Sequence, residues 1–192
     1  MSERPHITYR KLGQREAGLV KAHLLRLDEE SRRRRFFGHV ADVVIEDYCG
    51  NVLSTAYPIL GCFVDGVLRG VAELRPYGAS DTHKAEVAVS VEREFQGQGI
   101  GTELVRALIV LARNRSIRVL YMSCLRENGA MQAIARKLGG ALDFHESEVA
   151  ARITPPWPTY WSLMEEAFAD GRAVMHTLVL GQRHAAPASD AA

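Results

Sequence analysis

A valine-rich segment that runs directly into a glycine-rich loop constrains the fold of this chain more than any other feature. In residues 85–91, Val87, Val89 and Val91 alternate with small or polar residues, and this period of two predicts a strand. Residues 96–102 then read Gln-Gly-Gln-Gly-Ile-Gly-Thr, and apolar residues recur at helical spacing over residues 100–113. The chain therefore contains a strand, a glycine loop and a helix in succession.

A loop of this kind has the chemistry of an anion site. Glycines let the backbone approach a ligand closely, and the first amides of a helix have no partner within it. Together these groups suit a pyrophosphate. A Rossmann site would need G-x-G-x-x-G directly after the first strand, and a P-loop would need a lysine in the loop, which is absent here. The alternative is a tight strand–helix connection without a ligand.

Hydrophobic periodicity and turn residues predict the other elements around this motif. Asp65-Gly66 between the apolar runs 59–64 and 67–75 is a strong hairpin signal. Further strands are expected at residues 7–10, 118–124, 141–145 and 149–153. Helices are expected at residues 14–28, 29–37 (ended by Gly38), 41–53 and 128–138 (closed by Gly139-Gly140). A hairpin followed by alternating strands and helices predicts an α/β fold with a mixed sheet.

Residues 1–154 are expected to form one domain, because 192 residues can bury one sizeable core but would be cramped as two domains. Pro155, Pro156 and Pro158 break the pattern, and a C-terminal helical extension is expected over residues 155–182. The aromatic residues at positions 157, 160 and 161 are expected to pin this helix onto the domain. Residues 183–192 are small and featureless, which predicts a disordered tail.

The charge and cysteine content argue against several classes of function. The 24 basic and 23 acidic residues leave a net charge of +1, which gives no global attraction to nucleic acid or to a membrane surface. No apolar run approaches the ~20 residues of a transmembrane helix, and the first residues lack the apolar stretch of a signal peptide. Three widely spaced cysteines without a C-x-x-C pair predict neither a disulfide framework nor a bound metal, and they are typical of a cytoplasmic protein.

The glycine loop resembles the signature of the GNAT superfamily of N-acetyltransferases. Gln96-x-x-Gly99-x-Gly101 matches that family's Q/R-x-x-G-x-G/A motif, after a valine-rich strand and before an amphipathic helix. The resemblance covers roughly residues 7–153. It implies the GNAT fold, a mixed and mostly antiparallel sheet flanked by helices, with acetyl-CoA as co-substrate.

The resemblance also implies which residues bind the co-substrate. Val89 and Val91 would offer backbone groups to the pantetheine arm, and Asn128 would contact the cofactor near the next helix. The pyrophosphate loop would consist of Gln96, Gly97, Gln98, Gly99, Ile100, Gly101 and Thr102. Many family members carry a tyrosine on the helix after Asn128 as general acid for the leaving thiolate, whereas this chain has Ala135 there. Another group or solvent would then protonate the thiolate.

A narrower resemblance is to the catalytic domain of bacterial protein lysine acetyltransferases. Residues 27–37 are similar to their L-S-x-E-S-x-x-x-R-F-F segment, and residues 85–91 are similar to their strand that begins with Ala-Glu. The glutamate of that strand is implicated as the general base, and Glu86 matches it. A carboxylate can take the proton that an ammonium must lose before it attacks.

Other residues compete for catalytic roles. Asp81, His83 and Glu127 are alternative bases, and Cys124 is a candidate for a covalent acetyl-cysteine, although a cysteine on a core strand is more often inert packing. The basic run at residues 32–35 is expected to be a solvated helix face. It would otherwise bind an acidic partner or the 3′-phosphate of the cofactor.

Three functions are consistent with these features. The leading hypothesis is an acetyl-CoA-dependent N-acetyltransferase that acts on a protein lysine by direct attack on the thioester. The second is the same chemistry on a small-molecule amine, and the third is a non-catalytic acyl-CoA sensor, which the missing tyrosine favours. In each case the chain is expected to be a monomer or homodimer without nucleic-acid or membrane partners.

Overall fold

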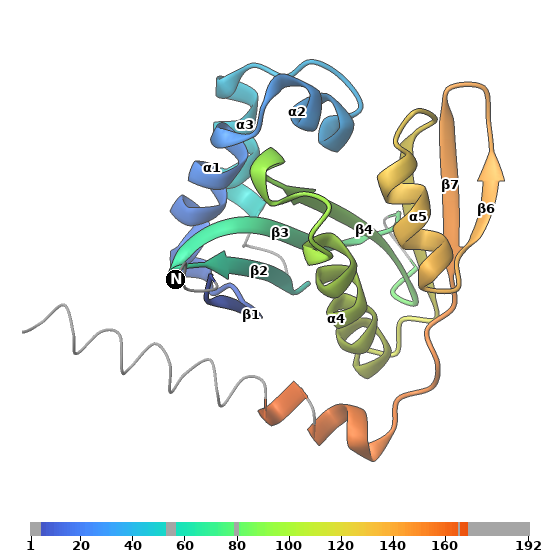
Figure 1. Cartoon of the computed structure of the whole chain (residues 1–192). Coiled ribbons are helices and arrows are strands. Elements are labelled where there is room, and N and C mark those ends of the chain that lie inside the picture. Colours follow the sequence, from blue (N-terminus) through green and yellow to red (C-terminus); the bar gives the residue numbers. More distant parts are fainter. Residues whose placement is uncertain (1–4, 53–56, 79–80, 165, 169–192) are drawn as a thin grey trace, which may run out of the picture.

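A seven-stranded sheet forms the centre of the computed structural model, which describes residues 5–52, 57–78, 81–164 and 166–168 (Figure 1). The strand order is β1-β2-β3-β4-β5-β7-β6, and every neighbouring pair is antiparallel except β4 and β5. The strands are β1 (Ile7–Lys11), β2 (Ile59–Val64), β3 (Val67–Pro76), β4 (Lys84–Val91), β5 (Val119–Leu125), β6 (Ala141–Phe144) and β7 (Glu148–Ile153). The predicted mixed, mostly antiparallel α/β sheet is confirmed.

The hairpin between β2 and β3 forms where the sequence predicts it. Asp65 and Gly66 both have positive φ angles, 49° and 81°. This conformation matches the twist of the two flanking strands, and it is the reason that Asp-Gly favours a two-residue turn. The strand expected to begin at Arg118 begins at Val119 instead, and the predicted final strand pair becomes β6 and β7, with β7 inserted between β5 and β6.

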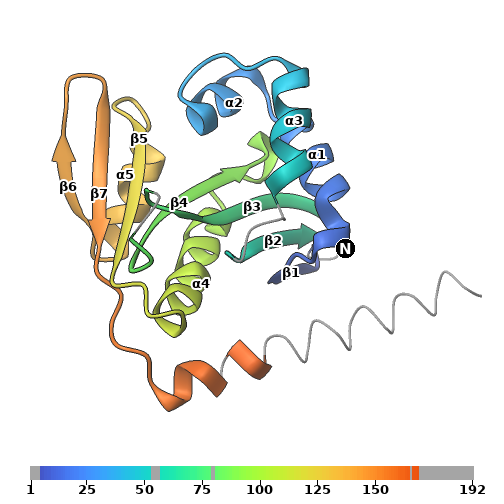
Figure 2. The same ribbon diagram turned by 180° about the vertical axis from the view of Figure 1, so that it is seen from behind.

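Helices cover both faces of the sheet and enclose two hydrophobic cores (Figures 1 and 2). They are α1 (Ala17–Arg26), α2 (Glu29–Phe36), α3 (Asp42–Val52), α4 (Ile100–Asn114) and α5 (Gly129–Lys137), with single 3₁₀ turns at Gln14–Glu16 and Arg93–Phe95. One core lies under α1 and α3 and includes Val71 of β3, and the other lies under α4 and α5 and includes Ala72 and Leu74. Successive residues of β3 therefore serve opposite cores, as the period of a strand requires.

Helix α2 ends differently from the prediction. Gly38 was expected to end it, but the C-cap is Phe37, which adopts the left-handed conformation with φ of 62°. A bulky residue adopts this conformation only where the surrounding structure compensates for the strain. The side chain of Phe37 lines the main cleft of the molecule, which is described below.

The parallel strands β4 and β5 are hydrogen-bonded to each other only near their N-terminal ends. Lys84, Ala85 and Glu86 pair with Val119, Leu120 and Tyr121, and no further pairs follow. Beyond this point the two strands diverge, as Figure 2 shows. The facing edges of β4 and β5 therefore carry backbone groups that no strand partner satisfies, and such groups are strong binding sites for a polar ligand.

The C-terminal segment docks mainly through polar side chains. Residues 160–164 and 166–168 are helical, and Ser162 and Glu166 hydrogen-bond to Asn114 at the end of α4, at 2.7 Å each. Trp157 contacts the guanidinium of Arg118, 4.2 Å from its ring centre, whereas Tyr160 and Trp161 are 71% and 79% exposed, which contradicts the prediction that they pin the helix. Residues 169–182 of the expected extension and the expected tail at 183–192 lie outside the described residues.

Two absences hold for the residues that the structure describes. No helix among them is long and apolar enough to span a membrane. No group of three or more histidine, cysteine, aspartate or glutamate side chains within the same residues has the arrangement of a metal site.

Candidate active site

A cleft of about 830 Å³ opens where β4 and β5 diverge. Its floor is β4, and its walls come from α2 on one side and from the glycine loop, α4 and α5 on the other. Most of the residues named from the sequence line it: Glu86, Val89, Val91, Gln96, Gly97, Gly99, Ile100, Gly101, Thr102 and Asn128. Gln98 is not part of the lining, since its side chain turns back to donate to the carbonyl oxygen of Glu94 at 3.0 Å.

The glycine loop leaves room for a ligand next to its backbone. Gly97 and Gly99 have φ angles of 73° and 85°, and a Cβ added to either would meet no atom within 4 Å. Gly99 is also the N-cap of the fifteen-residue helix α4, whose first amides lack partners within the helix. An open, amide-rich backbone at the positive end of a helix dipole fits a pyrophosphate group.

Gln96 connects the glycine loop to both neighbouring elements. Its amide nitrogen donates to the carbonyl oxygen of Val91 at 2.8 Å and to the hydroxyl of Ser31 on α2 at 3.1 Å. The Val91 carbonyl is one of the backbone groups on the free edge of β4. The side chain of Gln96 therefore holds the end of β4 and the start of α2 in register with the loop.

Asn128 combines a structural contact with a place on the cleft wall. Its side-chain oxygen caps α5 by accepting from the amide of Met131 at 3.2 Å. Its amide nitrogen has no partner within the described chain and is free for a ligand. The side chains of α5 that line the cleft are Ala130, Met131, Ala133, Ile134 and Lys137.

Ala135, at the position of the tyrosine found in many relatives, faces the core. It is 1% exposed and does not line the cleft. We expect Ala135→Tyr to destabilise the protein by about 1–3 kcal/mol, because a buried position of this size cannot hold a phenol ring without overpacking. It should not raise kcat. Urea unfolding measures the first effect, with Arg136→Tyr on the exposed face of the same helix as control. A large rise in kcat with a new alkaline limb would contradict this expectation and show that a missing acid had been limiting.

The carboxylate of Glu86 has no hydrogen-bond or ion-pair partner within the described residues. The acidic side chains around it are all engaged. Glu73 pairs with Arg35 at 2.6 Å, Glu92 with Arg26 and Arg69, and Glu30 with Arg33 and Arg34. Glu86 is therefore the carboxylate of the cleft whose lone pairs are available to a reacting group.

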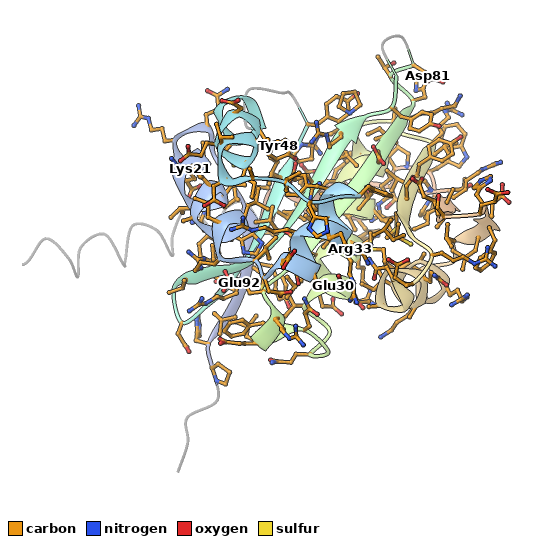
Figure 3. The ribbon with its side chains drawn as sticks, turned by 90° about the horizontal axis from the view of Figure 1, so that it is seen from above. Lys21, Glu30, Arg33, Tyr48, Asp81 and Glu92 are labelled. Atoms are coloured by element: carbon orange, nitrogen blue, oxygen red, sulfur yellow. The ribbon has the colours of Figure 1, made fainter. Side chains whose placement is uncertain are left out.

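The alternative bases occupy other places. His83 precedes β4, and its ring Nδ1 lies 3.0 Å from the carbonyl oxygen of Ser116. Asp81 pairs with Lys84, the first residue of β4, and lies far from Glu30 and Arg33 on α2 (Figure 3). Glu127 pairs with Arg33, whose hydrogen bond holds the pKa of that carboxyl below its ordinary value. His83, Asp81 and Glu127 do not line the cleft. Cys124 does line it, but burial raises the pKa of its thiol.

The run of arginines is a solvated face only in part: Arg33 and Arg34 are 30% and 37% exposed and pair with Glu30, whereas Arg32 and Arg35 turn inward. Arg32 donates to the carbonyl oxygens of Leu25 and Leu27, and its side chain is only 19% exposed. Arg35 is buried against Glu73, with Tyr48 accepting a second hydrogen bond at 2.8 Å. Burial alone would lower the pKa of Arg35, but the charge of Glu73 outweighs burial and raises it. Sequence spacing could not reveal this pair, because Glu73 lies on β3 and Arg35 on α2.

Removing one partner of this pair should be costly. We expect Arg35→Met to destabilise the protein by about 3–5 kcal/mol, because it leaves the carboxylate of Glu73, 2% exposed, with only the longer ion pair to Arg75 at 3.8 Å. Arg34→Met is the matched control, since Arg34 is 37% exposed and pairs with the exposed Glu30. Chemical denaturation of both variants gives the difference. Equal stability of the two variants would show that the buried pair contributes no more than a surface pair.

A second buried polar cluster joins α1 to the end of β4. His23 is fully buried, with its Nε2 3.0 Å from the hydroxyl of Ser90 and its Nδ1 3.1 Å from Glu92. Glu92 also accepts from Arg26 at 2.9 Å and Arg69 at 2.7 Å. These hydrogen bonds hold the pKa of Glu92 at about 2, although burial raises it. Sequence reasoning missed this cluster because its members are 67 and 69 residues apart.

Comparison with known proteins identifies the family. Residues 23–140, well over half of the chain, match the model of the GNAT acetyltransferase family. An acetyltransferase of Pseudomonas aeruginosa is 27% identical over 139 residues, which cover 70% of this chain and 74% of that protein.

Solved structures share the fold. The GNAT domain of the Streptomyces lividans PAT protein (S. lividans PAT) superposes with a TM-score of 0.66 at 19% identity, covering 76% of this chain and 89% of that one. YncA of Salmonella typhimurium, solved with its cofactor acetyl-CoA, superposes with a TM-score of 0.59 at 19% identity, covering 78% and 94%. The divergent strands, the glycine loop and the family match agree, and the chain belongs to the GNAT family as an acetyl-CoA-dependent acetyltransferase.

Proposed function

We propose that this acetyltransferase transfers the acetyl group to the side-chain amine of a protein lysine, with Glu86 as general base. The single observation that carries the proposal is the unpaired carboxylate of Glu86 on the floor of the cleft. An amine reaches the site as an ammonium and becomes a nucleophile only after it loses a proton. Glu86 accepts that proton directly or through a water molecule.

Different parts of the cleft bind different parts of acetyl-CoA. Gly97, Gly99 and the first amides of α4 hold the pyrophosphate, and the free edge of β4 at Val89 and Val91 binds the pantetheine amides. Bound acetyl-CoA supplies an activated acyl group on a good leaving group. No side chain need protonate the departing thiolate in concert, because free thiols titrate near ~8.5 and solvent can protonate them afterwards.

The walls near Glu86 support a lysine as acceptor. Phe36 and Phe37 at the end of α2 and Tyr48 of α3 line this part of the cleft. Their apolar surfaces suit the four methylene groups of a lysine, whose ammonium then lies beyond them at Glu86. The same segment carries the similarity to bacterial protein lysine acetyltransferases.

One observation favours a small amine that also carries a carboxylate. Arg75 lies directly opposite Glu86 on the neighbouring strand and lines the same cleft. Its guanidinium could pair with the carboxylate of an amino-acid acceptor while Glu86 takes the proton from the amine. A small-molecule amine acetyltransferase of amino acids is therefore the second candidate.

An acceptor panel distinguishes the two candidates. Release of free CoA is followed with acetyl-CoA and, separately, lysine-containing proteins and peptides, free amino acids and polyamines. The lysine proposal expects kcat/KM to be highest for a folded protein or peptide, with the acetyl group mapped to a lysine. If kcat/KM is instead highest for a free amino acid, and Arg75→Gln removes this preference, the second candidate replaces the lysine proposal.

A further inference from the structure

The buried cluster of Ser90, His23 and Glu92 places a hydroxyl, an imidazole and a carboxylate in one hydrogen-bonded series. The hydroxyl lies 3.0 Å from Nε2 and the carboxylate 3.1 Å from Nδ1 of the same ring. The three residues are 7%, 0% and 6% exposed, and Ser90 lines the cleft. Nothing in the proposed transfer to an amine uses this series.

The protonation states within the series follow from its neighbours. Arg26 and Arg69 keep Glu92 ionised, and an ionised carboxylate can only accept hydrogen bonds. Nδ1 of His23 must therefore donate. Burial lowers the pKa of His23, so the ring is neutral and its Nε2 carries a lone pair. The hydroxyl of Ser90 must then donate to Nε2.

This polarity is the one that activates a serine nucleophile: a hydroxyl bonded to a general base whose other nitrogen is oriented by a carboxylate. Cys124 also lines the cleft, but its thiol has no hydrogen-bonded general base of this kind among the described residues. The burial of this thiol favours its unreactive protonated form. Of the two side chains, Ser90 is the one whose hydroxyl has a hydrogen-bonded base.

We propose that Ser90 is a second, internal acetyl acceptor, which is acetylated from bound acetyl-CoA when no amine occupies the site. The Ser90 Oγ forms a bond to the acetyl carbonyl carbon, and the bond from that carbon to sulfur breaks. The proton of Ser90 passes to Nε2 of His23 and from there to the departing thiolate. The products are an acetyl ester on Ser90, neutral His23 and free CoA thiol, so the step needs no other reactant.

The location of Ser90 on β4 supports this role. It lies between Glu86 and the glycine loop on the same strand, next to Val89 and Val91, whose backbone edge borders the diverging gap.

The test uses the full chain and acetyl-CoA without any amine. The reaction is stopped in acid, and intact mass and peptide mapping locate the acetyl group. We expect one acetyl group on Ser90 in the native protein and none there in Ser90→Ala. Ser31 and Ser123 also line the cleft without a histidine partner, so they serve as internal controls and should stay unmodified.

The role of His23 is tested separately. His23→Gln should slow acetylation of Ser90 by about 100-fold or more, within the range of general-base contributions. His23 is fully buried, so the native protein provides a second measurement that does not depend on the folding of this variant. The rate of Ser90 acetylation should fall at acid pH as His23 becomes protonated.

Three results would overturn the proposal. The first is that the enzyme acetylates amines but carries no acetyl group on Ser90 at saturating acetyl-CoA. The second is that a folded His23→Gln variant acetylates Ser90 as fast as the native protein. The third is that the rate of Ser90 acetylation does not change with pH. Acetylation of Ser90 in Glu86→Gln would show that the internal step is independent of the amine base. Failure of one proposal can thus be told from failure of the other.

Discussion

Glu86→Gln should lower kcat/KM for the amine acceptor by about 10²–10⁴-fold, the usual contribution of a general base, while leaving the affinity for acetyl-CoA unchanged. The amide keeps the size of the side chain but cannot take the proton of an ammonium. Steady-state kinetics with the best acceptor measures the loss, and calorimetry measures the affinity. Glu127→Gln is the matched control, because Glu127 is on a nearby loop but pairs with Arg33 outside the cleft lining.

The pH profile gives an independent test of the same role. In the native protein kcat/KM should fall at acid pH, where the amine acceptor holds its proton more firmly. Glu86→Gln should change the shape of this profile, because an amide cannot take part in the proton transfer. If Glu86→Gln has the same pH profile and the same kcat/KM as the native protein, Glu86 is not the base, and His83 becomes the next candidate.

Gly99→Glu should remove measurable binding of acetyl-CoA. Position 99 has φ of 85° and open space where a Cβ would point, so a side chain there extends into the cleft. A carboxylate at this place repels the pyrophosphate and also faces the helix end that would otherwise attract it. Calorimetry with the folded variant gives the result, and an unchanged affinity would rule out the loop as the pyrophosphate site.

The strain of the left-handed conformation must be separated from the effect of charge. A residue with a Cβ pays roughly 1–2 kcal/mol there, wherever the glycine lies in the structure. Gly66→Glu at the β2–β3 turn is the matched control, since its φ is 81° and its surroundings are also open. Gly66→Glu should lose similar stability and keep full affinity for acetyl-CoA.

Local patterns in the sequence determined most of the elements and the glycine loop. The alternation in β4, the Asp65-Gly66 turn and the apolar face of α4 act between residues close in the chain, so their effects can be read from spacing. The loop at residues 96–102 is recognisable for the same reason, because its glycines and the helix start are adjacent. Only Gln98 does not reach the cleft, since its amide bonds back to Glu94.

Only the tertiary structure decided which polar residues are free to react. Glu73 and Glu86 both lie on neighbouring strands, yet the first is neutralised by Arg35 and the second has no partner in the described chain. The partner of Glu73 comes from an element far away in the sequence, as does the histidine that orients toward Ser90. Charge pairing and burial depend on contacts between distant segments, and short-range spacing carries no information about them. The sequence therefore named residues that line the cleft, and the packing of α1, α2 and α3 on the sheet determined which of its polar groups are paired.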